Sequence, residues 1–406
     1  MSIELIQARI KSVMRNLPPL PQVTRQLLLV IADENASAQD VSKVLSSDQA
    51  LAGKVLKLVN SSFYGVQQEV TTISRAVVLL GFSGVRNLAL GFGSISALQK
   101  LGGDIDMQGF WDHALANGAA SQVLAPFVKR RTDPEEAFLA GLMHDIGAYV
   151  LAAAVPDIYE PILADASRDR LDAEREMCGM THAQVGQGLL KFWELPEDFG
   201  LAARYHHDVE RACDGTQPLT NLVAVADVLA CIHGGSFETA ASEADIEQLL
   251  ATAGLTMEHI QSALVGMEAK IADMANFLHI SGARTGEVGT TGDQEASTCV
   301  VVTTDDARKE WASTLLRSMG HDLYPMEGLF NNASGSEAVD LVLVDPQCMT
   351  AGKFDQLMTF LSSLAAEVCL LMEPAAAPPR GAEDLPRLPL VFSRGKLQEV
   401  LTSPVA

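Results

Sequence analysis

The chain has 406 residues, of which 48% are hydrophobic, and it carries a formal net charge of −22. This length and composition predict two or three globular domains with packed cores. Because sequence-independent binding to nucleic acids depends on clustered lysines and arginines, the acidic balance argues against direct binding of DNA or RNA.

The six cysteines are scattered and form no Cys-x-x-Cys pair, which indicates reduced thiols. Residues 1–17 alternate charged and apolar side chains at helical spacing and lack the hydrophobic region of a signal peptide. No apolar run approaches the length that we expect of a membrane-spanning helix. We therefore predict a soluble, cytoplasmic protein with no membrane partner.

One segment divides the chain by composition. Residues 281–297 are rich in glycine, threonine, serine and glutamate and show no apolar periodicity, which is typical of a flexible linker. Residues 1–280 have the pattern of successive helices. Residues 298–406 alternate short apolar runs with helical patterns, as in a doubly wound parallel sheet. The sequence thus predicts an all-α domain followed by an α/β domain.

A His-Asp doublet, His144-Asp145, lies within a well-specified helical pattern. Asp133 can cap this helix and Pro134 suits its first position. Further histidines and one aspartate lie in or beside other predicted helices. Together the candidate ligands are His113, His144, Asp145, His182, His206, His207 and Asp227.

Imidazole and carboxylate are ligands that suit iron, manganese, zinc or magnesium. Each residue also has a structural explanation when taken alone. His113 can be a satisfied core histidine, and His206 and His207 can favour the negative end of a helix. Asp227 is the only charge in an apolar helix, where a carboxylate is costly unless it is paired or bound to metal. As a set, these residues predict a metal site.

Several ordered motifs resemble the HDOD domain, the HD-related output domain of bacterial signalling proteins. They are Leu17-Pro18-Pro19-Leu20-Pro21, the run Leu56 to Gly65, the run Ile73 to Gly81, Thr181 to Gly186, and Trp193-Glu194-Leu195-Pro196. The resemblance covers about residues 10–280 and implies an all-α fold, with an HD-superfamily core at about 105–280. The family is regarded as regulatory or interacting with partners and usually looks catalytically degenerate.

By resemblance, His113, His144, Asp145 and Asp227 match the metal ligands of HD hydrolases. His182, His206 and His207 match additional ligands of the HD-GYP cyclic-di-GMP phosphodiesterases, and Asp145 becomes the catalytic candidate. The chain departs from those enzymes at Gly109, where a further acidic ligand is common, and at Ala148, where a lysine is expected. It also lacks the Gly-Tyr-Pro loop after residues 206–207. Lys191, Arg204 and Arg211 are the nearby cations that remain, and each is more often a surface charge.

Residues 298–406 resemble a response-regulator receiver domain. Asp305 and Asp306 match its Mg²⁺-binding acidic pair, and Asp345 matches its phosphoacceptor. These residues can equally be solvated acids at strand ends. Met372-Glu373-Pro374 replaces the expected serine or threonine, and Lys396 is displaced from the expected Lys-Pro. A degenerate receiver that serves as a contact surface is therefore favoured.

Three functions remain open. The favoured one is a bacterial signalling and interaction protein that retains a divalent metal (Fe, Mn or Zn) without hydrolysing cyclic dinucleotides. Its partners would be other signalling proteins and a nucleotide ligand. The alternatives are a metal-dependent phosphohydrolase acting on cyclic-di-GMP or another nucleotide, and a nucleotide sensor without turnover.

Overall fold

A computed structural model describes residues 2–31, 33, 35–60, 66, 68–99, 108–165, 168–233, 241–278, 297–325, 339–361, 366–372, 378–379, 382, 385–388 and 397. Except for Ser297, the predicted linker 281–297 lies outside these residues. So do most of the Asn60 to Gly65 turn and Lys396.

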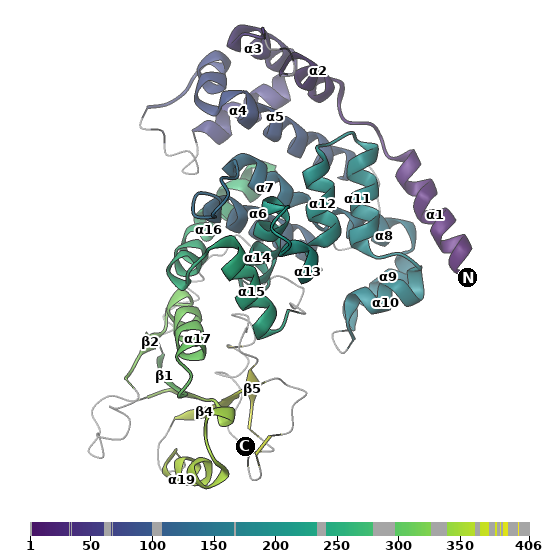
Figure 1. Cartoon of the computed structure of the whole chain (residues 1–406). Coiled ribbons are helices and arrows are strands. Elements are labelled where there is room, and N and C mark those ends of the chain that lie inside the picture. The colour runs from purple at the N-terminus through teal and green to yellow at the C-terminus, as the bar shows by residue number, and fades with distance from the viewer. Residues whose placement is uncertain are drawn as a thin grey trace. The chain divides into compact units, whose positions relative to one another are not determined.

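The chain divides into two compact units. The first comprises Met1–Cys231, Gly235–Thr256 and Gly266–Gly286, and the second comprises Ile232–Gly234, Met257–Val265 and Glu287–Ala406. The first unit is helical and the second contains the described strands (Figure 1).

The amino-terminal part of the first unit contains five helices, α1 (Ile3–Asn16), α2 (Gln22–Ile31), α3 (Ala38–Ser46), α4 (Gln49–Val59) and α5 (Ile73–Gln99). The predicted capping box of Ser37 and Asp40 begins α3. Helix α5 is kinked at Gly81, whose φ of 67° lies in the left-handed region that favours glycine.

The helices that follow are α6 (Gln108–Leu124), α7 (Pro134–Met143), α8 (Ile146–Ala154), α9 (Pro156–Ala164), α10 (Arg170–Cys178), α11 (His182–Phe192), α12 (Glu197–Tyr205), α13 (Val209–Ala212), α14 (Pro218–His233), α15 (Glu243–Ala253) and α16 (Met257–Leu278). Fully buried leucines, among them Leu115, Leu139, Leu151 and Leu189, form the core of this part. The sequence predicts one continuous helix around the His144-Asp145 doublet, but the structure has two helices there. Asp133 caps α7 with Pro134 at its first position, as expected, but α7 ends at Met143 and α8 begins after Asp145.

Two glycines let these helices approach closely. A Cβ atom on Gly147 in α8 would overlap the carbonyl oxygen of His182 at the start of α11, and one on Gly141 in α7 would lie 2.6 Å from Asn117 Oδ1 in α6. The absence of a side chain at Gly147 therefore permits the contact that brings His182 beside the doublet.

Two stretches of the described residues, Ile73–Leu98 and Pro134–Ala154, are long and apolar enough to span a membrane. The expectation that no apolar run reaches this length is therefore wrong. Within their most apolar windows, 61% and 89% of the residues are buried inside the protein, so packing between helices accounts for their composition.

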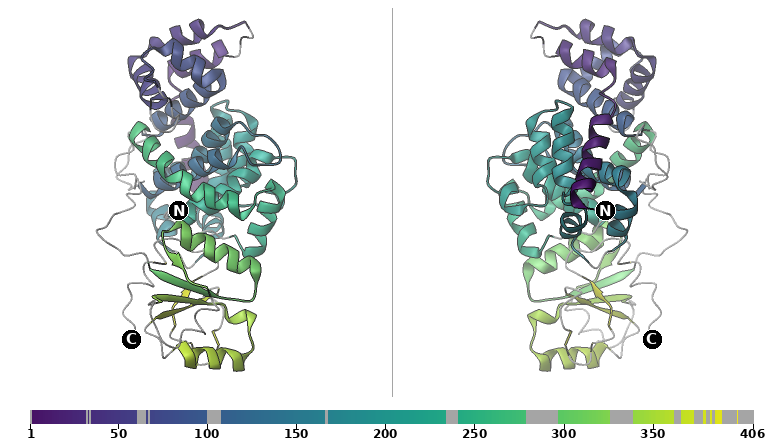
Figure 2. Two further views of the ribbon diagram at one scale, coloured as in Figure 1. Left: turned by 90° about the vertical axis from the view of Figure 1, so that its left-hand side faces the viewer. Right: turned by 90° about the vertical axis from the view of Figure 1, so that its right-hand side faces the viewer.

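The second unit contains a parallel five-stranded sheet in the order β2-β1-β3-β4-β5, formed by β1 (Thr298–Val302), β2 (Asp322–Leu323), β3 (Leu341–Val344), β4 (Glu367–Leu371) and β5 (Arg387–Leu388). Helices α17 (Asp306–Ser318) and α19 (Ala351–Leu361) lie on opposite faces of the sheet (Figures 1 and 2). A short 3₁₀ turn, Pro346–Cys348, follows β3. Alternate residues of β1 and β3, such as Val300 and Val342, pack with Phe354 and Leu361 of α19. Successive side chains of these strands point to opposite faces of the sheet, and both faces are buried. The strands therefore have nearly continuous apolar sequences.

Candidate metal centre

All seven histidines and aspartates singled out in the helical domain are brought to one place. His113 comes from α6, His144 and Asp145 form the turn between α7 and α8, and His182 opens α11. His206 and His207 follow α12, and Asp227 lies on α14. A capping box of Thr181 and Gln184 begins α11, as the sequence predicts.

The centre is almost completely shielded from solvent. His144 and His182 are fully buried, and His113, Asp145, His206 and Asp227 are each at most 5% exposed. The side chain of His207 is 27% exposed. Solvent therefore reaches the centre mainly on the side of His207.

Three of the imidazoles have their tautomer fixed by an acceptor on the outer side. The Nδ1 atom of His144 lies 2.6 Å from the carbonyl oxygen of Gly141, and that of His206 lies 3.0 Å from the carbonyl oxygen of Ala203. The Nδ1 atom of His182 lies 2.9 Å from both carboxylate oxygens of Glu174. Because Nδ1–H donates outward in each ring, each Nε2 atom faces the centre and offers its lone pair there when the ring is neutral. Burial lowers the pKa of His182, but Glu174 and Asp145 outweigh it and raise the pKa to about 9, so a metal ion would displace a proton from this Nε2.

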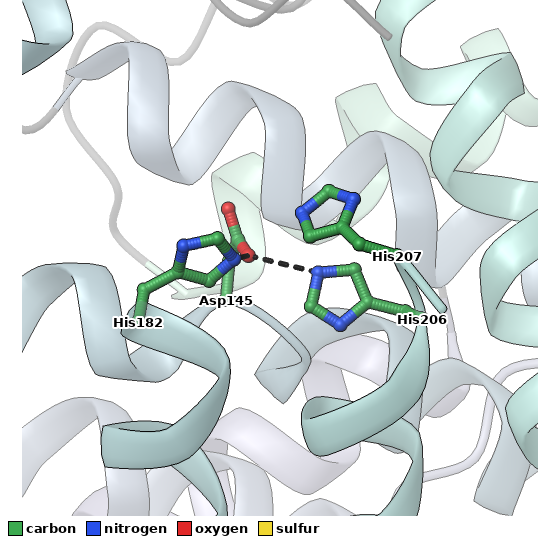
Figure 3. A group of neighbouring side chains, drawn as sticks. All are labelled: Asp145, His182, His206 and His207. Atoms are coloured by element: carbon green, nitrogen blue, oxygen red, sulfur yellow. Dashed lines mark ion pairs between the residues drawn. The ribbon is translucent and has the colours of Figure 1, made fainter. Parts of the chain in front are cut away.

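The inner atoms form a first group around Asp145 (Figure 3). Oδ1 of Asp145 lies 3.1 Å from Nε2 of His182 and 3.3 Å from Nε2 of His206. These three buried atoms have no hydrogen-bond partner. A carboxylate oxygen that faces two ring nitrogens without hydrogen bonds is unfavourable unless a cation lies among them. Together with His207, they fit a divalent metal ion.

A second group shares Asp145. Nε2 of His113 lies 3.2 Å from Nε2 of His144 and 2.9 Å from Oδ1 of Asp227. Nε2 of His144 lies 3.3 Å from the same Asp227 oxygen and 3.7 Å from Oδ1 of Asp145. Cis ligands of an ion at about 2.1 Å stand about 3 Å apart, so this group also has the spacing of a metal site. Cys231 lies near His113 and Asp227 and was not singled out from the sequence.

The electrostatics of the centre follow from its burial and its charge pairs. Burial lowers the pKa of His206, which favours the neutral ring that a metal requires. Burial alone would raise the pKa of Asp145, but the neighbouring His182, His144 and Arg170 outweigh it and hold the pKa well below its usual value. Asp145 is therefore a carboxylate at neutral pH.

A buried network outside the ligands was missed by the sequence analysis. Glu174 and Tyr159 are both fully buried, and Arg170 lies between Glu174 and Asp145. Burial would raise the pKa of Glu174, but His182 and Arg170 lower it to about 2. The sequence signal available was Glu174 in the middle of a strongly polar helix, where a solvated charge is the common explanation. Only the contact of Glu174 with His182 in the folded protein distinguishes it from a solvated acid.

The receiver-like candidate residues of the second unit form hydrogen bonds and an ion pair within that unit. Asp345, at the end of β3, is 1% exposed and accepts a hydrogen bond from Thr303 Oγ1 at 3.0 Å. Arg308 NH1 lies 3.3 Å from Oδ2 of Asp345. The side chain of Asp305 caps α17 by accepting from the backbone of Arg308, and Asp306 is the first residue of that helix. A guanidinium thus lies beside the carboxylate that the sequence analysis matched to the phosphoacceptor of a receiver domain.

Comparison with known proteins supports a family assignment for part of the helical unit. Residues 17–209 match the HDOD domain family, which supports an HDOD domain in this part of the chain. Asp227 lies beyond the matched residues yet folds into the same centre.

One curated relative is an uncharacterized protein of Treponema pallidum (strain Nichols), which is 28% identical over 216 residues. The match covers 52% of this chain and 42% of the relative, so the chain spans about two fifths of that relative's length.

Several solved structures are similar. The first is a proposed phosphohydrolase from Shewanella amazonensis SB2B, at 27% identity and a TM-score of 0.54, over 67% of this chain and 98% of that one. The second is a proposed signal transduction protein from Marinobacter aquaeolei VT8, at 25% identity and a TM-score of 0.53, over 68% and 66% of the two chains. An HDOD domain protein with unknown function from Geobacter sulfurreducens shares the fold, with a TM-score of 0.52 at 20% identity, over 71% of this chain and 99% of that one.

Proposed function

We propose that the chain is a regulatory or interaction protein of bacterial signal transduction whose HDOD domain holds divalent metal without hydrolysing cyclic dinucleotides. The observation that carries the metal assignment is the common tautomer of His144, His182 and His206. Each ring donates outward from Nδ1, so three Nε2 lone pairs meet at the buried carboxylate of Asp145.

The ligands divide between two adjacent positions that share Asp145. His182, His206 and His207 would hold one ion, and His113, His144 and Asp227 would hold the other. Iron, manganese and zinc all suit this mixture of imidazole and carboxylate. A bound divalent ion supplies a Lewis acid that polarises a phosphoryl oxygen and lowers the pKa of a coordinated water.

The groups that would hold a cyclic dinucleotide are lacking. Ala148, where a lysine is expected, is buried in α8 and offers no charge. Phosphoryl transfer needs positioned cations on the non-bridging oxygens in addition to metal. The guanidinium of Arg170, which contacts the doublet, is already bound to Asp145 and Glu174. Arg204 and Arg211 lie over the ring of Tyr205, at 5.4 and 5.9 Å from its centroid.

The second unit is proposed to be a degenerate receiver-like domain. Its strand order, β2-β1-β3-β4-β5, is that of flavodoxin-like folds. The ion pair of Arg308 with Asp345 supports a role in contacts with other signalling proteins rather than in phosphotransfer. We also propose that the protein is cytoplasmic and that it binds a nucleotide ligand.

The similarity to the Shewanella amazonensis protein favours one second candidate, a phosphohydrolase, which the proposed metal centre would make metal-dependent. Elemental analysis tests the metal that both functions require, and turnover separates the two functions. We expect the purified protein to contain iron, manganese or zinc, and the double variant His144→Ala with Asp145→Ala to contain none. We expect no sustained hydrolysis of cyclic-di-GMP by the metal-loaded protein. Metal-dependent turnover that the double variant abolishes would establish the phosphohydrolase instead.

A further inference from the structure

We propose that Glu174, Arg170 and Tyr159 form a buried outer shell that positions His182 and Asp145 and thereby sets the affinity of the ion at the His182 position. This inference rests on the proposed metal centre and assigns roles to three residues that are not themselves ligands. All three come from α9 and α10, which are adjacent in the chain and pack together.

Glu174 fixes the ring of His182. Both of its carboxylate oxygens lie 2.9 Å from Nδ1, and Oε2 also accepts the backbone N–H of His182 at 2.7 Å. Both side chains are fully buried, so water does not compete for these bonds. A carboxylate that accepts the Nδ1 proton keeps Nε2 as the donor to a metal and makes that nitrogen more basic.

Arg170 orients the carboxylate of Asp145. Its NH1 lies 3.3 Å from Oδ2, and its Nε lies 3.2 Å from Oε1 of Glu174. The guanidinium therefore compensates two buried carboxylates at once and engages the outer oxygen of Asp145. Oδ1 is left facing His182 and His206.

Tyr159 completes the shell. Its hydroxyl donates to Oε1 of Glu174 at 2.8 Å and accepts from NH2 of Arg170 at 2.9 Å. The hydroxyl thus links the carboxylate of Glu174 and the guanidinium of Arg170 by hydrogen bonds and fixes their relative orientation. A network in which each buried polar group is satisfied is rigid, and rigidity reduces the cost of organising the ligands when an ion binds.

The network supports the two metal positions unequally. It contacts His182 directly, whereas His144 is oriented by the carbonyl oxygen of Gly141. The network also contacts Asp145, which is shared by both metal positions. Loss of Glu174 should therefore weaken the ion at His182 much more than the ion at His113 and His144.

The test uses Glu174→Gln in the full chain. The amide is close to isosteric, but it removes the charge and turns an NH₂ group toward the donors of His182, Arg170 or Tyr159. Loss of such an outer-shell partner typically weakens metal binding by about 10–100-fold. The matched control is Glu176→Gln on the same helix, whose exposed side chain pairs with Arg168. Tyr159→Phe is a milder second variant that removes only the hydroxyl.

Zinc affinity and stoichiometry would be measured by chelator competition, and the ring tautomers by nitrogen NMR of histidine-labelled protein. We expect two ions in wild type and in Glu176→Gln, one of them weakened about 10–100-fold in Glu174→Gln. In the metal-free state of that variant, the Nδ1–H tautomer of His182 should be less populated than in wild type. Those of His144 and His206 should persist, which shows that the variant is folded.

If wild type binds zinc and Glu174→Gln binds it with unchanged affinity, or loses both ions equally while folded, the outer-shell assignment is wrong and the metal centre stands. If wild type binds no metal, the proposed function itself fails and this inference fails with it.

Discussion

Gly147 and His182 lie in such close contact that a Cβ atom on the glycine would overlap the carbonyl oxygen of the histidine. The two residues come from α8 and α11, and their contact sets the distance between Asp145 and His182. The first prediction follows from this approach.

Gly147→Ala should destabilise the helical domain by about 1–3 kcal/mol or more, because overpacking forces backbone to move. Metal content should fall with it, since α11 carries His182. Chemical denaturation and elemental analysis would measure both. The control is Gly53→Ala in α4, where a Cβ atom meets nothing within 4 Å. That change should be neutral or stabilise by about 0.5–1 kcal/mol. Equal stability of the two variants would contradict the close packing of α8 on α11.

Metal should stabilise the native state by mass action, because the unfolded chain cannot assemble ligands from five separate places in the sequence. At a free metal concentration of about 100 times Kd, the expected gain is about 2.7 kcal/mol per site. Thermal unfolding of stripped and reloaded protein would measure it, with Glu176→Gln expected to behave as wild type. His206→Ala should show a smaller gain, because Nε2 of His206 faces Oδ1 of Asp145. A wild-type melting temperature that does not change with metal would refute the site.

Treatment with Mg²⁺ and a phosphoryl analogue should leave the arrangement of the two domains unchanged. Arg308 already pairs with Asp345, and Thr303 donates to the same carboxylate oxygen. Solution scattering of wild type and Asp345→Ala, each with and without the analogue, would measure the response. A large rearrangement found only in wild type would show a working receiver and overturn the assignment of a degenerate one.

The buried strand cysteines should resist alkylation. Burial, with smaller effects from nearby acids, raises the pKa of Cys299 in β1 and of Cys369 in β4 to about 12. Since the thiolate is the nucleophile, its fraction at pH 8 is very small and grows only as the pH approaches 12. Peptide mapping after iodoacetamide treatment should find both unlabelled in native protein and labelled after denaturation. The half-exposed Cys213 serves as the comparison, and labelling of Cys299 at its rate would show that the sheet opens readily.

Much of the local structure could be predicted from the sequence because its causes are local. Asp133 and Pro134 begin α7, and Thr181 with Gln184 begins α11, since capping depends on residues three or four positions apart. Alternation of apolar runs and helical patterns likewise predicted the parallel strands β1, β3 and β4. The seven candidate ligands could be chosen by residue type and by resemblance to the HDOD domain.

Their convergence, however, depends on packing between helices that are distant in the chain. The break between α7 and α8 turns Asp145 toward His182 and His206, and the local pattern predicted one continuous helix there. The role of Glu174 is still less visible in the sequence, because an acid on a polar helix is ordinarily solvated. Residue type determined which groups can bind metal, whereas the tertiary structure decided which nitrogen of each ring faces inward. That choice depends on the backbone carbonyl groups of Gly141 and Ala203, each three residues before its ring, and on the carboxylate of Glu174. Only the packing of α10 against the start of α11 places that carboxylate beside His182.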